Sequence, residues 1–205
     1  MRAAVVVVAL LAAGCNGPSA PQQRAAQRRA TQVRDLAAQA GLPAAARDVF
    51  ALAARGAAAT YTATYTTAGD TLVISHRGAN LRVDTEDGGT VLVLGSTTYV
   101  CDRSSCQRSA QPYEGLRPLD EGALRDLLRS WRGARGVYTF HAGTRVIAST
   151  RARCVTVTGP SSAMLCVSPD GVPLLVETPT ASLHATRYRT SVAGDAFRLP
   201  APTHG

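Results

Sequence analysis

The segment Thr60-Tyr61-Thr62-Ala63-Thr64-Tyr65-Thr66 carries a strong β-strand pattern. Threonine occupies every even-numbered position, and tyrosine or alanine occupies every odd one. An alternation with a period of two places the two sets of side chains on opposite faces of a β-strand. β-Branched and aromatic residues also favour strands over helices. The stretch therefore predicts a strand with a threonine face and a tyrosine–alanine face.

Similar short strands are predicted on the C-terminal side of this one. Turn sequences such as Ala68-Gly69-Asp70 and Asp87-Gly88-Gly89 separate them. Links of this length are too short for parallel crossovers, so we expect an antiparallel meander. The expected strands cover residues 71–76, 80–85, 90–95, 97–101, 137–141, 144–149, 153–158, 163–168, 172–177 and 181–190.

Two regions have a helical period instead. Apolar residues at the i, i+3, i+4 and i+7 positions predict helix over residues 30–54, interrupted at Gly41-Leu42-Pro43. A second helix is predicted over residues 119–131, with an apolar stripe of Leu124, Leu127, Leu128 and Trp131. The order is then helix, about five strands, helix, and five or six strands. This order predicts an α+β fold: a strongly curved antiparallel β-sheet (a half-barrel) of about ten strands, with helices capping the concave face.

The N-terminus has the layout of an export signal. Arg2 is followed by the uninterrupted apolar run 3–13 and then by Gly14-Cys15. The segment Leu11-Ala12-Ala13-Gly14-Cys15 resembles a bacterial lipobox. That resemblance implies a signal peptide over residues 1–14, cleavage before Cys15, and lipid attachment to its sulfur. The alternative is an ordinary signal peptide with an incidental cysteine.

These features divide the chain into four parts. Residues 1–14 are the signal peptide, 15–29 a lipidated cysteine with a flexible tether, 30–200 the folded domain and 201–205 a tail. A lipid at Cys15 would hold the protein at the cell membrane, facing the extracytoplasmic side.

Four further cysteines suggest disulfide bonds in an exported chain. Gly159-Pro160-Ser161 is a predicted turn, and a hairpin centred on it places Cys154 opposite Cys166. A shorter turn brings Cys101 to Cys106 in the same way. We therefore predict the pairs 101–106 and 154–166. The alternative, a zinc site, lacks the usual ligand spacing and a nearby histidine.

The composition argues against several classes of function. The 22 basic residues are all arginine, and they are scattered singly rather than gathered on one helix face, so we expect no nucleic-acid binding. The commonest enzyme motifs are missing from the sequence, and we expect no catalytic residues, metal or cofactor. The four histidines, His76, His141, His184 and His204, are interpreted as surface or strand-edge residues. A hydrolase with a spatially assembled triad stays as a minor alternative.

The layout resembles the superfamily of the periplasmic lipoprotein carrier LolA and the mycobacterial lipoproteins LppX and LprG. The resemblance rests on the lipobox, the helix before the first Tyr-Thr strand, the helix over 119–131 within a meander, Asp170-Gly171-Val172-Pro173, and the closing Phe197-Arg198-Leu199-Pro200. It implies an open half-barrel whose apolar hollow, capped by helices, holds acyl chains or a lipidated partner. The four additional cysteines are not a general feature of that superfamily.

Candidate ligand-binding residues are the apolar side chains of the first strands and of the capping helix. They are Tyr61, Tyr65, Leu72, Ile74, Leu81, Val83, Val91, Val93, Leu124, Leu128 and Trp131. The same residues fit a plain packed core, so both interpretations stay open. In the ligand-wall interpretation Trp131 and Leu128 form the lid of the cavity. The leading hypothesis is a non-enzymatic lipoprotein that binds a lipid or acyl chain. The alternative is a protein-interaction or envelope-sensing module of the same fold, without lipid cargo.

Overall fold

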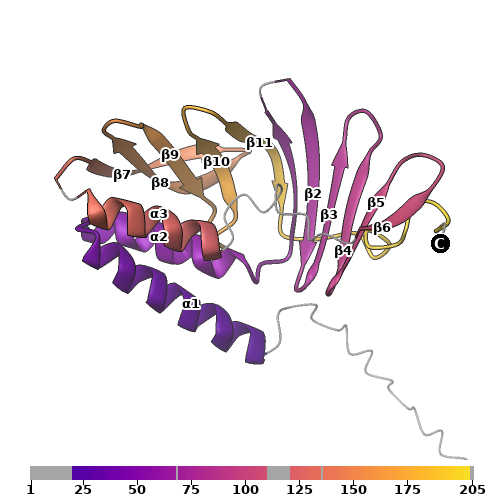
Figure 1. The fold of residues 1–205 in the computed structure, drawn as a ribbon, viewed down its shortest axis with the longest axis horizontal. Coiled ribbons are helices and arrows are strands. Elements are labelled where there is room, and N and C mark those ends of the chain that lie inside the picture. The colour runs from indigo at the N-terminus through magenta and orange to yellow at the C-terminus, as the bar shows by residue number, and fades with distance from the viewer. Residues whose placement is uncertain (1–19, 68, 110–120, 135, 204–205) are drawn as a thin grey trace, which may run out of the picture.

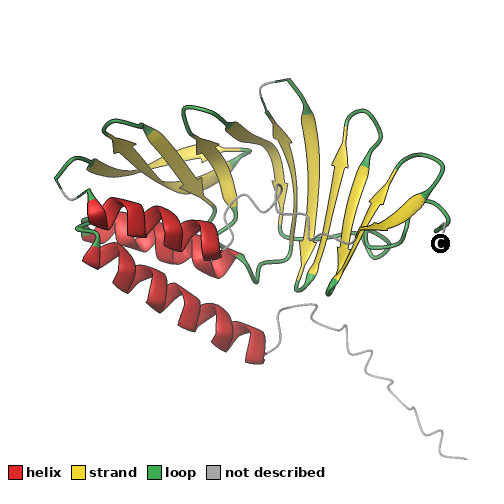
Figure 2. Cartoon of the chain, in the orientation of Figure 1, coloured by secondary structure: helices red, strands yellow, loops and turns green. Residues whose placement is uncertain are grey.

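A computed structural model describes residues 20–67, 69–109, 121–134 and 136–203. This described part of the chain holds three helices and eleven strands (Figures 1 and 2). The helices are α1 (Ala20–Gln39), α2 (Ala44–Gly56) and α3 (Glu121–Gly133). The strands are β1 (Tyr61–Thr66), β2 (Thr71–Arg77), β3 (Asn80–Thr85), β4 (Thr90–Leu94), β5 (Thr97–Cys101), β6 (Cys106–Ser109), β7 (Thr139–Ile147), β8 (Thr150–Thr158), β9 (Ala163–Val167), β10 (Pro173–Glu177) and β11 (Ser182–Arg189).

All eleven strands join one antiparallel sheet in the order β6-β5-β4-β3-β2-β1-β11-β10-β9-β8-β7. It consists of two meanders, β1–β6 and β7–β11, joined by the pairing of β1 with β11. The sheet is open, because β6 and β7 lie at opposite edges. The predicted α+β class and antiparallel sheet are confirmed.

Helices α1 and α2 are separate, as the Gly41-Leu42-Pro43 interruption predicted. Gly41 adopts a positive φ of 84°, a conformation that glycine takes without steric cost, and Leu42 N–H then bonds back to the carbonyl of Ala37 at 3.0 Å. Helix α1 begins at Ala20, so residues 20–29, which we expected to belong to a flexible tether, are helical instead. Alanine, glutamine and arginine are good helix formers, and buried Ala26 and Ala30 give this part of the helix a packed face.

The three helices pack together against one half of the sheet (Figure 2). Helix α2 contacts β7, β8 and β9, while α1 and α3 pack on α2 and on each other. The last turn of α2 lies close to the β9–β10 turn, where Gly56 meets Gly171. A Cβ atom at Gly171 would overlap the carbonyl oxygen of Leu52, and Gly171 has a positive φ of 84°. Glycine at these two positions therefore sets how closely the helix approaches the turn.

Strand β7 differs from the prediction for this region. Residues 137–141 and 144–149 were expected to be two strands, but residues 139–147 form one strand, paired without interruption to β8. The hairpin turn lies at Ala148 and Ser149, whose φ angles are 47° and 60°. Two positive φ angles are typical of a two-residue hairpin turn, in which glycine and asparagine are usual. Because neither residue is present here, the turn gave no signal in the sequence.

Both predicted disulfides are confirmed. Cys101 is bonded to Cys106 and Cys154 to Cys166, and the members of each pair lie directly opposite each other on adjacent strands. In the short turn between Cys101 and Cys106, the Asp102 carboxylate accepts hydrogen bonds from the backbone N–H groups of Ser104 and Ser105, at 2.7 and 2.8 Å. These bonds, that from Ser104 foremost, lower the pKa of Asp102.

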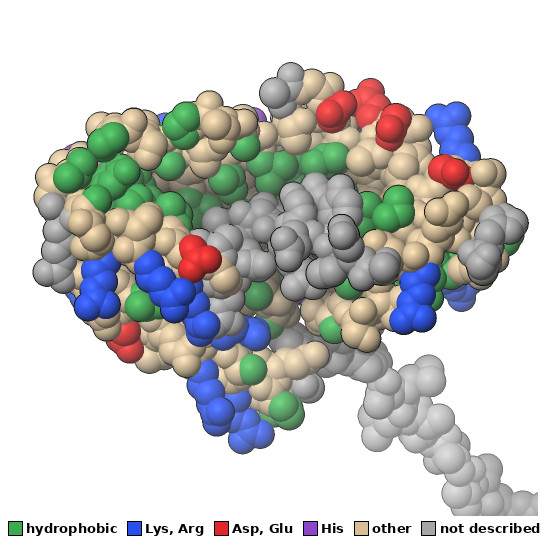
Figure 3. Space-filling model, viewed as in Figure 1, with side chains coloured by type: hydrophobic (Ala, Val, Ile, Leu, Met, Phe, Trp, Pro, Cys, Tyr) green, Lys and Arg blue, Asp and Glu red, His purple; other side chains and the backbone are tan. Residues whose placement is uncertain are grey.

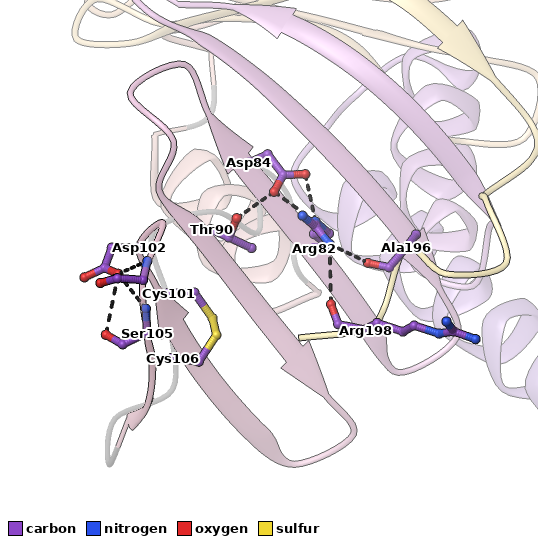
Figure 4. The surroundings of a disulfide bond; sticks show 10 residues. Arg82, Asp84, Thr90, Cys101, Asp102, Ser105, Cys106, Ala196 and Arg198 are labelled. Atoms are coloured by element: carbon purple, nitrogen blue, oxygen red, sulfur yellow. Dashed lines mark hydrogen bonds and ion pairs between the residues drawn. A yellow bond between two sulfur atoms is a disulfide. The ribbon is translucent and has the colours of Figure 1, made fainter. Parts of the chain in front are cut away.

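The segment after β11 crosses one face of the β1–β6 half, where Arg82 meets the carbonyls of Ala196 and Arg198 (Figure 4), and it continues to the β6 edge. Arg77 donates to the carbonyl of Val192 at 2.8 Å, and Arg82 donates to that of Ala196 at 3.2 Å. Cys106 N–H donates to the carbonyl of Pro202 at 2.9 Å, and Thr203 forms a parallel bridge with Cys106. The C-terminal segment thus covers the polar face of this half and the backbone of its edge strand.

None of the helices among the described residues is long and apolar enough to cross a membrane. The predicted signal peptide and Cys15 lie outside the described residues.

Candidate apolar binding face

The eight candidate residues on strands share one face of β1–β4. The register pairs Ala63 with Ile74, Ile74 with Val83, and Val83 with Val91. Neighbouring rows pair Tyr65 with Leu72 and Leu81 with Val93. Residues directly opposite each other on paired strands point to the same face, so these rows form one continuous apolar surface. We call this surface the β1–β4 face; it consists of Tyr61, Tyr65, Leu72, Ile74, Leu81, Val83, Val91 and Val93.

The β1–β4 face is buried, and it belongs to a core cluster that is built from the sheet. Each of its eight side chains is at most 9% exposed. The cluster continues into the β7–β8 hairpin through Ile147 and Ala152, and into β10 through Leu174. No described residue of α1, α2 or α3 belongs to this cluster. Strands and turns alone, among the described elements, therefore contribute its side chains.

The three candidate residues of α3 lie elsewhere. Leu124, Leu128 and Trp131 belong to a second cluster, which joins the three helices to β8 and β9. The Trp131 ring lies 5.6 Å from Phe50 of α2 and 5.2 Å from Phe140 of β7, measured between ring centroids. The structure thus brings the eight strand residues together but places Trp131 and Leu128 against the helices and β7, apart from the face that they were expected to cover.

Tyrosines mark the border of the β1–β4 face toward β11. Tyr61 lies 6.5 Å from Tyr188 and 5.6 Å from His76, between ring centroids. The Tyr65 hydroxyl donates to the carbonyl of Pro173 at 2.8 Å, which satisfies its polar group. Burial raises the pKa of Tyr61 and Tyr65 well above the usual value and raises the pKa of Tyr188 to about 12. All three phenols are therefore neutral over the physiological pH range.

Sequence reasoning missed Tyr188 and its polar partners. Its hydroxyl lies 3.3 Å from the hydroxyl of Ser168 and 3.1 Å from the Asp170 carboxylate, to which it donates. Tyr188 reaches the β1–β4 face because β1 pairs with β11, which sets it opposite Ala63. No local pattern signals a pairing between the first and last strands, and only the alternation within 182–189 could have placed Tyr188 on an inner face.

Several hollows adjoin the helices, among them a groove and an aromatic hollow. A groove of about 700 Å³ lies between α1, the end of α2 and the segment after β11, and its lining includes Gln27, Arg55, Arg77, Asp170 and Ser191. A smaller hollow of about 410 Å³ is lined by Trp131, Tyr138 and Phe140 together with small residues. The larger groove carries charged and amide side chains, whereas the smaller one is aromatic.

The three described histidines lie on three different strands, β2, β7 and β11. His76 Nδ1 lies 2.6 Å from the carbonyl of Ala59, while His141 and His184 are exposed; His204 lies outside the described residues. No group of three or more His, Cys, Asp or Glu side chains that could hold a metal is found among the residues that the structure describes.

A scan against protein-family models and a search of curated proteins each found no match to this chain.

Proposed function

We propose that this protein is an exported lipoprotein, without enzymatic activity, that binds an apolar ligand such as a lipid acyl chain. The observation that carries the proposal is the β1–β4 face: eight apolar side chains on four adjacent strands, in a cluster to which no described helix contributes. In the β7–β11 half, the apolar surface of β8 and β9 is covered by α2. On an apolar sheet face that no helix covers, a ligand can occupy the place that a helix would otherwise take.

The proposed architecture is a half-barrel with its helices on the concave side. A sheet of eleven twisted strands curls strongly, which favours a hollow rather than a flat surface. In Figure 1 the helices lie beneath β7–β10, and β2–β6 extend beyond them. In Figure 3 hydrophobic side chains gather in the recess between the helices and the strands. These features support a cavity next to the helices rather than directly beneath them.

The chemistry of the face favours an acyl chain over a polar ligand. Six of its side chains are aliphatic and two are tyrosines, and the Tyr65 hydroxyl is already bonded to the Pro173 carbonyl. Such a surface offers dispersion and hydrophobic contacts, worth about 0.8 kcal/mol for each buried methylene. A chain of ten or more methylenes therefore gains enough from burial to bind without a specific polar contact.

The N-terminal part of the proposal is attachment to the cell membrane through a lipid on Cys15. A single acyl chain gives weak and reversible membrane binding, whereas two or more chains give a stable anchor. Metabolic labelling with an alkyne fatty acid should label the chain and should not label its Cys15→Ser variant. Labelling of both proteins would remove this part of the proposal.

Ligand binding is tested with cis-parinaric acid, whose fluorescence rises in apolar sites. We expect saturable binding at one probe per chain. Val91→Trp, on the β1–β4 face, should abolish binding because the larger side chain occupies the position proposed for the acyl chain. Val73→Trp, on the opposite face of β2, is the matched control and should bind as the unmodified protein does. Absence of binding by the unmodified protein, or equal binding by both variants, would contradict the proposal.

A further inference from the structure

The two edges of the sheet differ in how their backbone is protected. Strand β6 has four residues, is joined to β5 by the Cys101–Cys106 disulfide, and is covered by the C-terminal segment through Pro202 and Thr203. Strand β7 has nine residues, contains no proline, and pairs with β8 without a bulge. Exposed edges of this length bind further strands unless they are blocked. Strand β7 is therefore the edge at which pairing can continue.

The hairpin turn defines which backbone groups of β7 are unpaired. In a hairpin with a two-residue turn, the residues that flank the turn exchange both of their hydrogen bonds, and the pattern alternates from there. The flanking pair is Ile147 with Thr150. The amides of Phe140, Ala142, Thr144 and Val146 then point away from β8. Within the described part of the chain, no backbone hydrogen bond beyond the β7–β8 ladder involves these four residues.

The β7 edge is held in place by its neighbours. The Cys154–Cys166 disulfide joins β8 to β9, and Phe140 packs against Trp131 of α3. An added strand therefore meets a preformed template, so little ordering of this protein opposes binding.

Charge indicates the kind of segment that fits. The hairpin 139–158 contains Arg145, Arg151 and Arg153 and no acidic residue. All three arginines are exposed, and none forms an ion pair with another described residue. Arg145 lies on the edge strand itself, next to the position of an added strand, and the other two lie one strand further in, on β8. A carboxylate on an incoming strand would face Arg145 directly.

We propose that the β7 edge binds an extended, acidic segment of another protein by β-strand addition. The unpaired amides of β7 supply the main-chain hydrogen bonds, and Arg145 on the edge strand selects a segment with carboxylates on the face that it occupies. A second copy of this chain fits less well. Antiparallel pairing of two β7 strands about Gly143 would place Arg145 opposite His141 and bring two purely cationic hairpins together. This inference is independent of the acyl-chain proposal, because it uses a different part of the sheet.

The test is calorimetric titration of the protein with three blocked nine-residue peptides. The first alternates threonine and glutamate, the second replaces glutamate by lysine, and the third is the glutamate peptide with alternate backbone amides N-methylated. We expect one glutamate peptide to bind per chain and the other two to bind at least roughly tenfold more weakly. No binding of the glutamate peptide, or equal binding of all three, would overturn the proposal.

Variants of the protein locate the site. Arg145→Glu should weaken binding of the glutamate peptide by roughly fivefold or more, while Arg187→Glu, a charge reversal at an exposed position on the internal strand β11, should leave it unchanged. Thr144→Pro should abolish binding, and circular dichroism shows whether that variant folds; the N-methylated peptide tests the same hydrogen bonds without changing the protein. Equal loss in the two arginine variants would overturn the assignment to β7. Sedimentation velocity could instead show a dimer that dissociates on Arg145→Glu. The β7 edge would then bind a second copy of this chain, and the proposal of an acidic partner segment would be overturned as well.

Discussion

The two halves of the sheet are built from the same alternation of residues but are covered differently. In the β7–β9 half the apolar side chains of β8 and β9 pack against α2, and aromatic contacts of Trp131 close the layer. In the β1–β4 half an equally apolar face is buried in a cluster without a described helix residue. Its opposite face is crossed by the C-terminal segment. The alternation of residues within a strand determines which face of the sheet is apolar. Segments elsewhere in the chain determine what covers that face.

A large loss of stability is expected from breaking the contact that holds α2 to the β9–β10 turn. Gly171→Ala places a methyl group on the Leu52 carbonyl in a backbone conformation that alanine disfavours. Overpacking and the positive φ together should lower the free energy of unfolding by about 3–4 kcal/mol. Gly143→Ala is the control, because nothing lies within 4 Å of a Cβ atom there. Urea unfolding measures both; equal, small changes would show that the close approach of α2 is not required.

Truncation of one buried leucine in each core cluster compares how tightly the two clusters are packed. Leu124→Ala removes a fully buried side chain between the helices and should cost about 3–5 kcal/mol. Leu81→Ala, on the β1–β4 face, should cost less, about 2–3 kcal/mol, because its side chain is 8% exposed and the site lies nearer the border of the core. The same urea experiment compares them. A larger loss for Leu81→Ala would mean that the β1–β4 face is the better packed of the two.

Much of the fold follows from local pattern. The Thr-Tyr alternation, the Gly41-Leu42-Pro43 interruption and the cysteine spacing led to β1, to the division of α1 from α2, and to both disulfides. The β7–β8 turn was missed because Ala148 and Ser149 carry no turn signal. The helical start of α1 was missed because its polar residues resemble a tether, although Ala26 and Ala30 are buried.

The candidate site was predictable only in part. The strand residues were found because alternation and register keep them on one face. The position of Trp131 could not be predicted, since a helical stripe shows that a helix is packed but does not show on which strands. The pairing of β1 with β11, which brings Tyr188 to the face, depends on strands more than a hundred residues apart.

The disulfides provide one stabilising bond in each half. Replacing Cys154 and Cys166 by alanine opens a loop with a sequence separation of 12 and should lower the free energy of unfolding by about 3 kcal/mol. Replacing Cys101 and Cys106 opens a loop with a separation of 5 and should cost about 2 kcal/mol. Thermal unfolding of the two double variants gives the order. A reversed order would show that the Cys101–Cys106 disulfide stabilises the β1–β6 half beyond closing its own loop.

A smaller effect is expected from the tyrosines that border the β1–β4 face. They should change how the free energy of unfolding depends on pH. Burial raises the pKa of Tyr61, Tyr65 and Tyr188 in the folded protein, so each stays protonated after the same group has ionised in the unfolded chain. Their contribution is fully present below the unfolded pKa of about 10 and is lost as the pH rises above it, by up to about 1.4 kcal/mol per pH unit for each group. Urea unfolding between pH 8 and 11.5 should therefore show constant stability up to about pH 10 and a steep fall above it. The fall should be shallower in Tyr65→Phe, and an identical slope in that variant would contradict the assignment to Tyr65.

Binding of an acyl chain to the β1–β4 face is tested most directly by photo-crosslinking with a diazirine fatty acid, followed by peptide mapping. The label should appear on peptides of β1–β4, which carry Ile74, Val83 and Val91, and excess palmitic acid should prevent this labelling. Labelling confined to α1–α3 and β7–β9, or labelling that palmitic acid does not prevent, would contradict binding at this face.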